Sequence, residues 1–281
     1  MSTTSSALDA LLQARYGSST DAAHSVAAHT LNPCLETQLK HRSVRSYQDK
    51  ALAPDTLELL VAAAQSASTS SNLQSWSVVA VEDPERKNRL ARLAGNQDHI
   101  RACPLFLVWL VDLARLDALG ERRGLARDSL DYLELLMVGI IDATLAAQNA
   151  ALAAESLGLG IVYIGGMRNQ PEAVAAELGL PPRTFAVFGM CVGHPNPERI
   201  TSVKPRLPQQ AVLHREQYQA HQVTTSADNY IAIMSSFYQR HGIKTNGDWD
   251  QHSLHRVRGP DAMTGRERLA EALRKLGFAM R

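Results

Sequence analysis

The segment from Asp131 to Leu157 constrains the fold more than any other part of the chain. It is apolar on most sides, and as a helix of about 27 residues it would be roughly 40 Å long. Polar side chains such as Asp142 and Gln148 recur along it, and each would be costly in hydrocarbon. We therefore expect a core helix and no membrane span. One modest domain does not cover such a helix alone, so a partner subunit is expected to cover the remainder.

Shorter elements surround this helix. Apolar runs predict strands at 75–81, 105–111, 161–164 and 184–192. Helical spacing, caps and prolines predict helices at 7–16, from Leu57 to Ala64, from Asp83-Pro84 to Leu93, after Asn169, at 230–240 and at 266–276. Mixed strands and helices without repeats indicate one α/β or α+β domain with C-terminal additions, spanning residues 36–281 after an N-terminal extension of residues 1–35.

Charge and terminal composition exclude several classes of partner. Lys and Arg number 29 against 28 Asp and Glu, which predicts neither a nucleic-acid partner nor a polybasic membrane tail. Residues 1–30 are rich in Ala, Ser and Thr and lack the basic and apolar regions of a signal peptide, so we expect a cytoplasmic protein. Cys34, Cys103 and Cys191 stand far apart without ligand-spaced histidines, which predicts buried reduced thiols and no metal site.

Two short cationic runs could bind a phosphate. His41, Arg42, Ser43 and Arg45 place three cations and a hydroxyl within five residues, and in an extended chain alternate residues share one face. Far downstream, Lys204-Pro205-Arg206 holds two cations beside a residue with fixed φ. A solvated turn and a surface loop are the alternative interpretations, and spacing alone does not choose. Convergence of the two runs in space is a hypothesis.

A glycine-rich segment from Gly158 to Arg168 ends a predicted buried strand in Gly165 and Gly166. Backbone without side chains can approach a flat ligand closely there, although turn glycines are the simpler interpretation. The segment is not a dinucleotide fingerprint, because its first glycines close a helix and precede a strand. The chain also lacks a phosphate loop, a nucleophile elbow and an HExxH motif.

Several motifs together resemble one family, the oxygen-insensitive NADPH-dependent nitroreductases and the related flavin reductases that bind FMN. The resemblance covers about residues 36–281. It is carried by His-Arg-Ser-Val-Arg at 41–45, the serine-rich loop ending in Leu73-Gln74, the segments 95–99, 148–150, 155–160 and 162–169, and Lys-Pro-Arg-Leu-Pro at 204–208. It implies an α+β nitroreductase-like fold: a central, mostly antiparallel sheet flanked by helices, a long helix at a homodimer interface, and a C-terminal excursion.

The resemblance also assigns roles to residues. It implies that FMN and its phosphate are held by His41, Arg42, Ser43, Arg45, Lys204 and Arg206. Ser68, Thr69 and Ser70 would approach the cofactor from the neighbouring subunit, and Gln97 would bind the pyrimidine side of the ring. Tyr163, Gly165, Gly166 and, as a further contact, Arg168 would lie near the reactive edge of the ring. The nearest match to the family's arginine for the NADPH 2′-phosphate is Arg240, shifted by one residue.

The implied function is a reductase in which FMN carries the chemistry, so no catalytic acid or base is assigned. NADPH, rather than NADH, reduces FMN and leaves, and a nitroaromatic, quinone or flavin then takes two electrons in a ping-pong reaction. Asn72 stands where the family often has Phe, and the segment from Asp112 to Leu130 is longer than usual. These departures keep a second interpretation open, a flavin-binding carrier or sensor without turnover.

Overall fold

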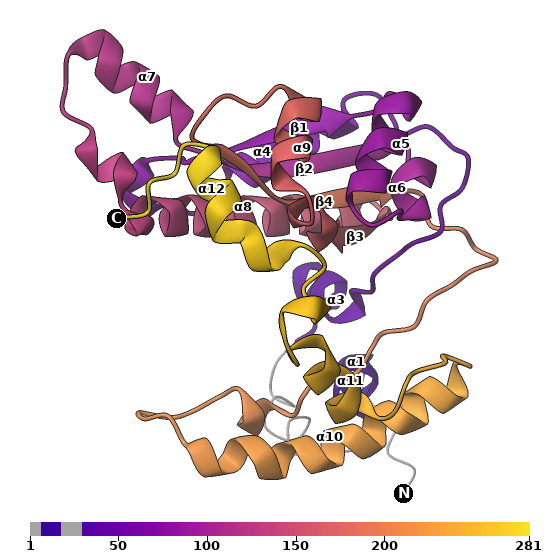
Figure 1. Ribbon diagram of the computed structural model, residues 1–281. Helices are drawn as coiled ribbons and strands as arrows, with labels where there is room; N and C mark the ends of the chain where they lie inside the picture. Colours follow the sequence, from indigo (N-terminus) through magenta and orange to yellow (C-terminus); the bar gives the residue numbers. More distant parts are fainter. Residues whose placement is uncertain (1–6, 18–29) are drawn as a thin grey trace, which may run out of the picture. The chain divides into compact units, whose positions relative to one another are not determined.

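The computed structural model describes residues 7–17 and 30–281 (Figure 1). It contains two compact units. Unit 1 combines residues 1–42 with 201–262, and unit 2 combines residues 43–200 with 263–281. The predicted boundary between residues 35 and 36 marks where the family resemblance begins. It did not concern compact units, so it stays a prediction.

Unit 2 is built on one four-stranded sheet with the order β1-β2-β4-β3. The strands are β1 (Trp76–Val81), β2 (Leu105–Asp112), β3 (Gly160–Ile164) and β4 (Thr184–Gly193). Every neighbouring pair is antiparallel, which confirms the predicted α+β class and its mostly antiparallel sheet. All four predicted strands are present.

Unit 2 also contains several helices. They are α4 (Thr56–Gln65), α5 (Pro84–Leu93), α6 (Asp98–Ala102), α7 (Ala114–Arg123), α8 (Leu133–Ser156), α9 (Pro171–Leu178) and α12 (Leu269–Lys275). The last is shorter than the helix predicted at 266–276, because residues 266–268 form a separate 3₁₀ turn. Neither α6 nor α7 was predicted.

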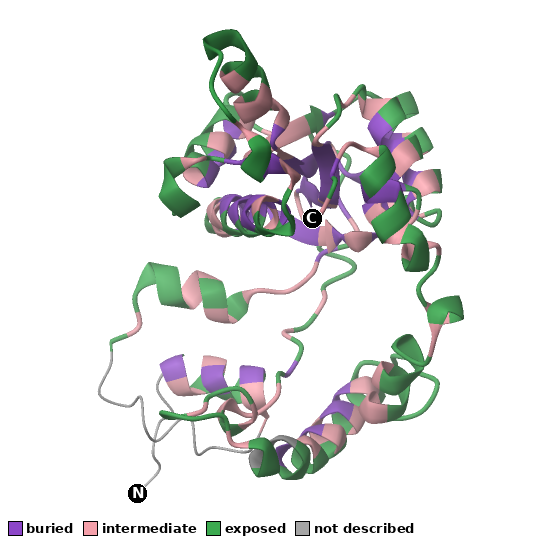
Figure 2. Ribbon diagram, turned by 60° about the vertical axis from the view of Figure 1, so that its left-hand side comes forward, coloured by how far each residue is buried: buried purple, intermediate pink, exposed green. Residues whose placement is uncertain are grey.

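Strand β2 is apolar from Leu105 to Val111 because both faces of the sheet are covered. Successive side chains of a strand point to opposite faces. Phe106 and Val108 pack in a cluster with residues of α5 and α9, whereas Leu107 and Trp109 pack with residues of α4 and α8. Figure 2 shows the buried residues gathered on the strands and on the sides of the surrounding helices. The unbroken apolar run in the sequence is therefore the signature of a central strand.

Helix α8 is the predicted core helix and has two different faces. Its buried face is largely alanine and contains Ala143, Ala146, Ala147, Ala150, Ala151 and Ala154. Gly139 packs directly against β2, since a Cβ there would be 2.5 Å from Cγ1 of Val111. Half of the most apolar stretch of this helix is buried within the fold. The opposite face exposes Leu133, Met137, Ile141 and Leu145, each four residues after the last.

The described residues of unit 1 form helices and connecting segments. Its helices are α1 (Ala7–Tyr16), α3 (Pro33–Lys40), α10 (Ala220–Arg240) and α11 (Trp249–Arg256). Tyr230, Met234 and Phe237 on α10 form a small core with partly buried neighbours, and the ring of Tyr230 meets the ring of Trp249 edge to face. Helix α1 was predicted, although its proposed cap, Ser6, lies outside the described residues.

Helix α3 was not predicted, and one prediction about unit 1 needs correction. Helix α3 begins after Asn32, because Asn32 Oδ1 accepts a hydrogen bond from the Leu35 amide at 3.0 Å and Pro33 occupies the first turn. Cys34 was expected to be buried and is exposed, since it lies on the solvent side of this short helix. Cys103 and Cys191 in unit 2 are buried as predicted.

Candidate functional site

The first cationic run continues into unit 2 as extended chain. Ser43 forms a β-bridge with Ile161, and the Val44 amide donates to the Ile161 carbonyl at 2.8 Å. Val44 is buried, and its carbonyl accepts the hydroxyl of the buried Tyr47 at 2.7 Å. Arg45, one residue on, is exposed. The alternation expected for an extended chain is therefore present, with the cation on the open side.

A buried donor without a partner among the described residues is present in each unit, and either one could bind an oxyanion. The described residues provide no hydrogen-bond partner for Nε of Arg42 in unit 1 or for Nε2 of His99 in unit 2. A buried polar atom without a partner costs about 1–3 kcal/mol, and bound phosphate oxygens would remove that cost. Burial, followed by the positive charge of Arg45, lowers the pKa of His99 below its usual value of 6.5. In the sequence, His99 is the last residue of the motif at 95–99, and the resemblance assigned it no role.

The second cationic run lies in unit 1 and has one inward and two outward side chains. Pro205 is buried, and its carbonyl accepts the hydroxyl of Tyr230 at 3.0 Å. Lys204 and Arg206 on either side of it are exposed. The alternation leaves both cations accessible to an anionic ligand.

In unit 2 the structure brings the predicted ring-binding residues Gln97 and Gly166 together. Gln97 follows α5 and donates through Nε2 to the Ala94 carbonyl at 2.7 Å. A Cβ at Gly166 would lie 2.3 Å from that carbonyl oxygen and 2.8 Å from the Gln97 side chain. Gly166 is thus required by packing alone. Gly165 has more room, since a Cβ there would meet only the Arg168 guanidinium, at 3.4 Å or more.

Arg168 and Tyr163 flank these glycines. Arg168 Nη1 donates to the Val187 carbonyl, so part of its guanidinium is committed to the fold. The Tyr163 hydroxyl donates to Gln148 Oε1 at 3.4 Å, and its ring meets Phe188 edge to face at 5.3 Å. Burial raises the pKa of Tyr163, so this side chain is a neutral hydrogen-bonding group. Both residues have fixed orientations at the end of β3.

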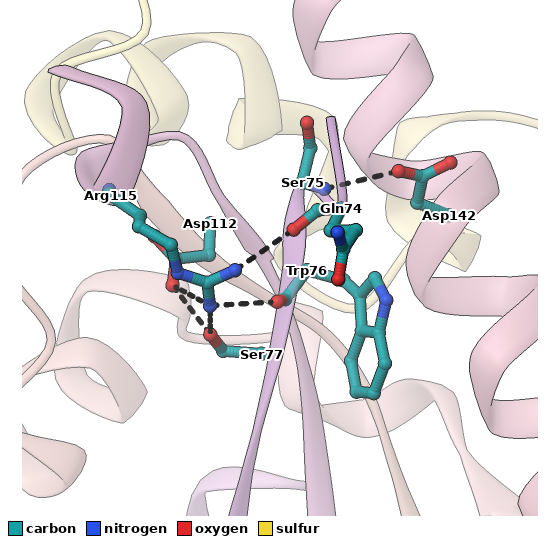
Figure 3. Close-up of polar contacts among 7 residues, drawn as sticks. All are labelled: Gln74, Ser75, Trp76, Ser77, Asp112, Arg115 and Asp142. Atoms are coloured by element: carbon teal, nitrogen blue, oxygen red, sulfur yellow. Dashed lines mark hydrogen bonds and ion pairs between the residues drawn. The ribbon is translucent and has the colours of Figure 1, made fainter. Parts of the chain in front are cut away.

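The serine-rich loop is held by a carboxylate that the sequence did not single out as a site residue. Asp142 on α8 is 1% exposed and accepts three hydrogen bonds. The donors are Thr69 Oγ1 at 2.6 Å, the Ser70 amide at 3.1 Å and the Ser75 amide at 3.1 Å. Figure 3 shows Asp142 reaching from its helix to the start of β1. Ser68 and Ser70 have exposed side chains, whereas the Thr69 hydroxyl is directed into this network.

Arg115 holds the C-terminal end of the same loop by hydrogen bonds on both sides of Ser75. Arg115 donates to the carbonyls of Gln74 and Trp76 at 3.1 and 3.2 Å and to Ser77 Oγ at 2.8 Å (Figure 3). Between the two anchors, Ser71, Asn72 and Gln74 have positive φ of 49°, 55° and 51°. Left-handed backbone at residues other than glycine is strained and is concentrated at functional sites. The loop also borders a cavity of about 330 Å³ whose lining includes Asn72 and Arg115.

Arg240, the residue matched to the NADPH 2′-phosphate, borders a separate cavity of about 900 Å³ within unit 1. Helices α1 and α10 and the segment around Val203 line it, with Ser202 and His241 among the polar residues. Arg240 is exposed and donates through Nε to the Ser236 carbonyl at 3.3 Å. The cavity thus combines a cation, hydroxyl groups and apolar walls in one unit.

The sequence match to known proteins extends over both units. The Nitroreductase family model matches residues 39–97 and 92–194, and the model of the Nitroreductase family, C-terminal domain, matches residues 204–281. The chain belongs to the nitroreductase family. An FMN reductase (NADPH) of Bacillus subtilis is 42% identical over 220 residues, which cover 77% of this chain and 86% of the relative. The NADPH-flavin oxidoreductase of Vibrio harveyi is 37% identical over 254 residues, covering 89% of this chain and all of the relative.

Solved structures agree with this membership. The nitroreductase NfrA1 of Bacillus subtilis has a TM-score of 0.82 at 38% identity, and the match covers 88% of this chain and 100% of that one. The NADPH:FMN oxidoreductase of Vibrio harveyi complexed with NAD⁺ has a TM-score of 0.79 at 36% identity, covering 89% and 100%. The nitroreductase fold implied by the motifs is thereby confirmed.

Replacing Asp142 tests its role in holding the serine-rich loop. Asp142→Ala is expected to lower the free energy of unfolding in urea by about 3 kcal/mol or more, since hydrogen bonds to charged groups contribute about 1.5–3 kcal/mol each. Asp142→Asn should fall between that variant and the unmodified protein. Glu134 on the same helix is exposed, and Glu134→Ala is the matched control with an expected change within about 0.5 kcal/mol. Equal losses for the two alanine variants would contradict this role.

The lowered pKa of His99 predicts a pH dependence of stability. Because the folded-state pKa lies below the unfolded value, folding favours the neutral ring. This contribution is complete above about pH 6.5 and is lost as the pH falls through the folded-state pKa. We expect the Tm of the flavin-free protein to fall between about pH 7 and 5, and to fall less in His99→Gln. His252→Gln, at an exposed position of α11, should keep the original slope. Parallel slopes for all three proteins would refute the assignment.

Proposed function

We propose that this protein is an FMN-dependent reductase that oxidises NADPH and passes two electrons to nitroaromatics, quinones, flavins or similar acceptors. The observation that carries the proposal is the family match across both units, with relatives named FMN reductase (NADPH), NADPH-flavin oxidoreductase and oxygen-insensitive NADPH nitroreductase. The buried, partnerless donors of Arg42 and His99 support a phosphate-bearing ligand independently of those names.

Residues in each unit are proposed to bind the cofactor. In unit 1 the proposed phosphate ligands are His41, Arg42, Lys204 and Arg206. In unit 2 they are Ser43 and Arg45. His99 is added because its buried Nε2 has no partner among the described residues. The proposed ring contacts in unit 2 are Gln97, Tyr163, Gly165, Gly166 and Arg168. Ser68, Thr69 and Ser70 are proposed to reach the cofactor of a second subunit. Arg240 is proposed to bind the 2′-phosphate of NADPH.

The protein's own part in the reaction is positioning and charge. FMN, when bound, would supply the two-electron redox chemistry between NADPH and the acceptor. The close packing of Gly166 against Ala94 and Gln97 fixes the backbone at the end of β3, where amide groups can be offered to the ring. Arg168 places a partly buried positive charge beside these glycines, and such a charge stabilises an anionic ring.

The exposed face of α8 supports a homodimer. Leu133, Met137, Ile141 and Leu145 form an apolar stripe on a helix whose opposite face is already buried in unit 2. Contiguous exposed apolar surface marks an interface, and a second copy of the chain would cover the length of α8 that one subunit leaves open. We propose that this homodimer is cytoplasmic.

The function is tested by the visible spectrum of the FMN-loaded protein under anaerobic conditions. NADPH is expected to bleach the flavin absorbance, and a quinone or nitroaromatic should restore it. Arg240→Ala should raise the KM for NADPH about tenfold, equivalent to about 1.4 kcal/mol, and leave the KM for NADH unchanged, because only NADPH carries the 2′-phosphate. Arg256→Ala on α11 removes an equally exposed cation of unit 1 and serves as the control. A flavin that neither nucleotide bleaches would instead indicate a carrier or sensor.

The dimer is tested by placing a charge in the apolar stripe. Ile141 is 52% exposed within one chain, so Ile141→Glu should leave the subunit folded. At a dimer interface the same change buries an unpaired carboxylate, and we expect a shift from dimer to monomer in sedimentation velocity. Leu119→Glu, on the exposed side of α7, adds the same charge outside the stripe and should not change the mass. An unmodified protein that sediments as a monomer would exclude this interface.

A further inference from the structure

Helix α1 buries a charged residue on its apolar face. Leu8, Leu12 and Arg15 recur at helical spacing and are 8%, 7% and 7% exposed. Just beyond the helix, the Cβ position of Gly17 lies 3.0 Å from the Ile233 side chain of α10. A guanidinium is rarely buried unless its N–H groups have acceptors, because the cost of desolvating it is large. The acceptors of Arg15 therefore indicate what this helix holds in place.

The Arg15 side chain binds backbone carbonyls of two segments that are far apart in the sequence. Nη1 donates to the Lys204 carbonyl at 3.1 Å. Nη2 donates to the carbonyls of Leu39 and His41 at 2.9 and 3.0 Å. In return, the Arg15 carbonyl accepts the Arg206 amide at 2.8 Å. All of these residues belong to unit 1, so one arginine joins the backbones of both cationic runs.

Arg15 and Tyr230 bond to backbone groups of the second run and not to its cationic side chains. Tyr230 holds the Pro205 carbonyl from α10 while Arg15 holds the backbone on both sides of Pro205. Lys204 and Arg206 are exposed. Lys204 and Arg206 lie two residues apart on this fixed backbone, and the pair sets up a site whose charge a phosphate would complement. The planar guanidinium of Arg15 has donors at two ends and can reach all three carbonyls. A lysine ammonium would not span the same carbonyls.

Helix α1 precedes the part of the chain that the nitroreductase family models match, which begins at residue 39. We propose that Arg15 is a positioning residue for the cofactor phosphate: it fixes the backbone beneath His41, Lys204 and Arg206 so that their side chains are set for the phosphate before FMN binds. The proposal rests on the proposed function. It gives the N-terminal extension a part in cofactor affinity, in which α1 acts through the backbone of other residues and does not touch the ligand.

The test compares FMN with riboflavin, which has the same ring and no phosphate. The full-length apoprotein and its Arg15→Ala, Arg15→Lys and Arg256→Ala variants are titrated with each flavin, and Kd is measured from the quenching of flavin fluorescence. We expect Arg15→Ala to weaken FMN at least tenfold and riboflavin less than twofold. Arg15→Lys should restore only part of the FMN affinity. Arg256→Ala, which removes an exposed cation from the same unit, should match the unmodified protein.

The alternative outcomes are distinct. Equal weakening of FMN and riboflavin by Arg15→Ala would overturn the proposal, because α1 would then act only on folding. Unchanged Kd values for both flavins would overturn it as well. An unmodified protein that does not bind FMN would refute the proposed function and this inference with it. If Arg15→Ala does not fold, Arg15→Lys decides: selective loss of FMN affinity supports positioning, and full FMN affinity contradicts it.

Discussion

The alanines on the buried side of α8 let this helix lie close to strand β2 and helix α4, and much of unit 2 is arranged around that contact. Alanine loses no side-chain entropy on burial and fills little space, so a long helix can pack along a sheet without large gaps. The close approach also brings Asp142, beside the first of these alanines, within hydrogen-bonding distance of the loop before β1. The packing of the core and the shape of a predicted cofactor loop therefore have the same origin.

The strands and the long helix were predictable because their signals are local. An unbroken apolar run such as Leu105 to Val111 has few ways to be buried other than as a central strand, and a proline at a first helical turn marked α5 and α9. Helices α7 and α11 were not predicted, because neither contains a buried residue and so neither needs a periodic apolar face. Such helices depend on their setting in the fold rather than on their own propensity.

The candidate site likewise contains residues that the sequence predicted and residues that it did not. Cations at 41–45 and 204–206 were visible as charge and spacing. The roles of Asp142, Arg115 and Arg15 were not, because each is defined by hydrogen bonds to backbone groups distant in the sequence or in a loop of unpredicted conformation. One charged side chain in a helix resembles another until its partners are known. A buried charge is informative only once its acceptors or donors have been identified, since the cost of burying it must be offset by them.

The two departures from the family pattern that the resemblance suggests both involve the serine-rich loop. Asn72 has a left-handed backbone, which asparagine adopts at lower cost than a bulky residue, and its Oδ1 accepts a hydrogen bond from Gln74 Nε2 at 3.1 Å. The segment from Asp112 to Leu130, which the resemblance implies is longer than usual, contains α7, and Arg115 near the start of that helix holds the carbonyls of Gln74 and Trp76. Asn72 and Arg115 also line the same cavity. Both departures thus have a local structural explanation in the conformation of the serine-rich loop, and neither needs a loss of nicotinamide access to account for it.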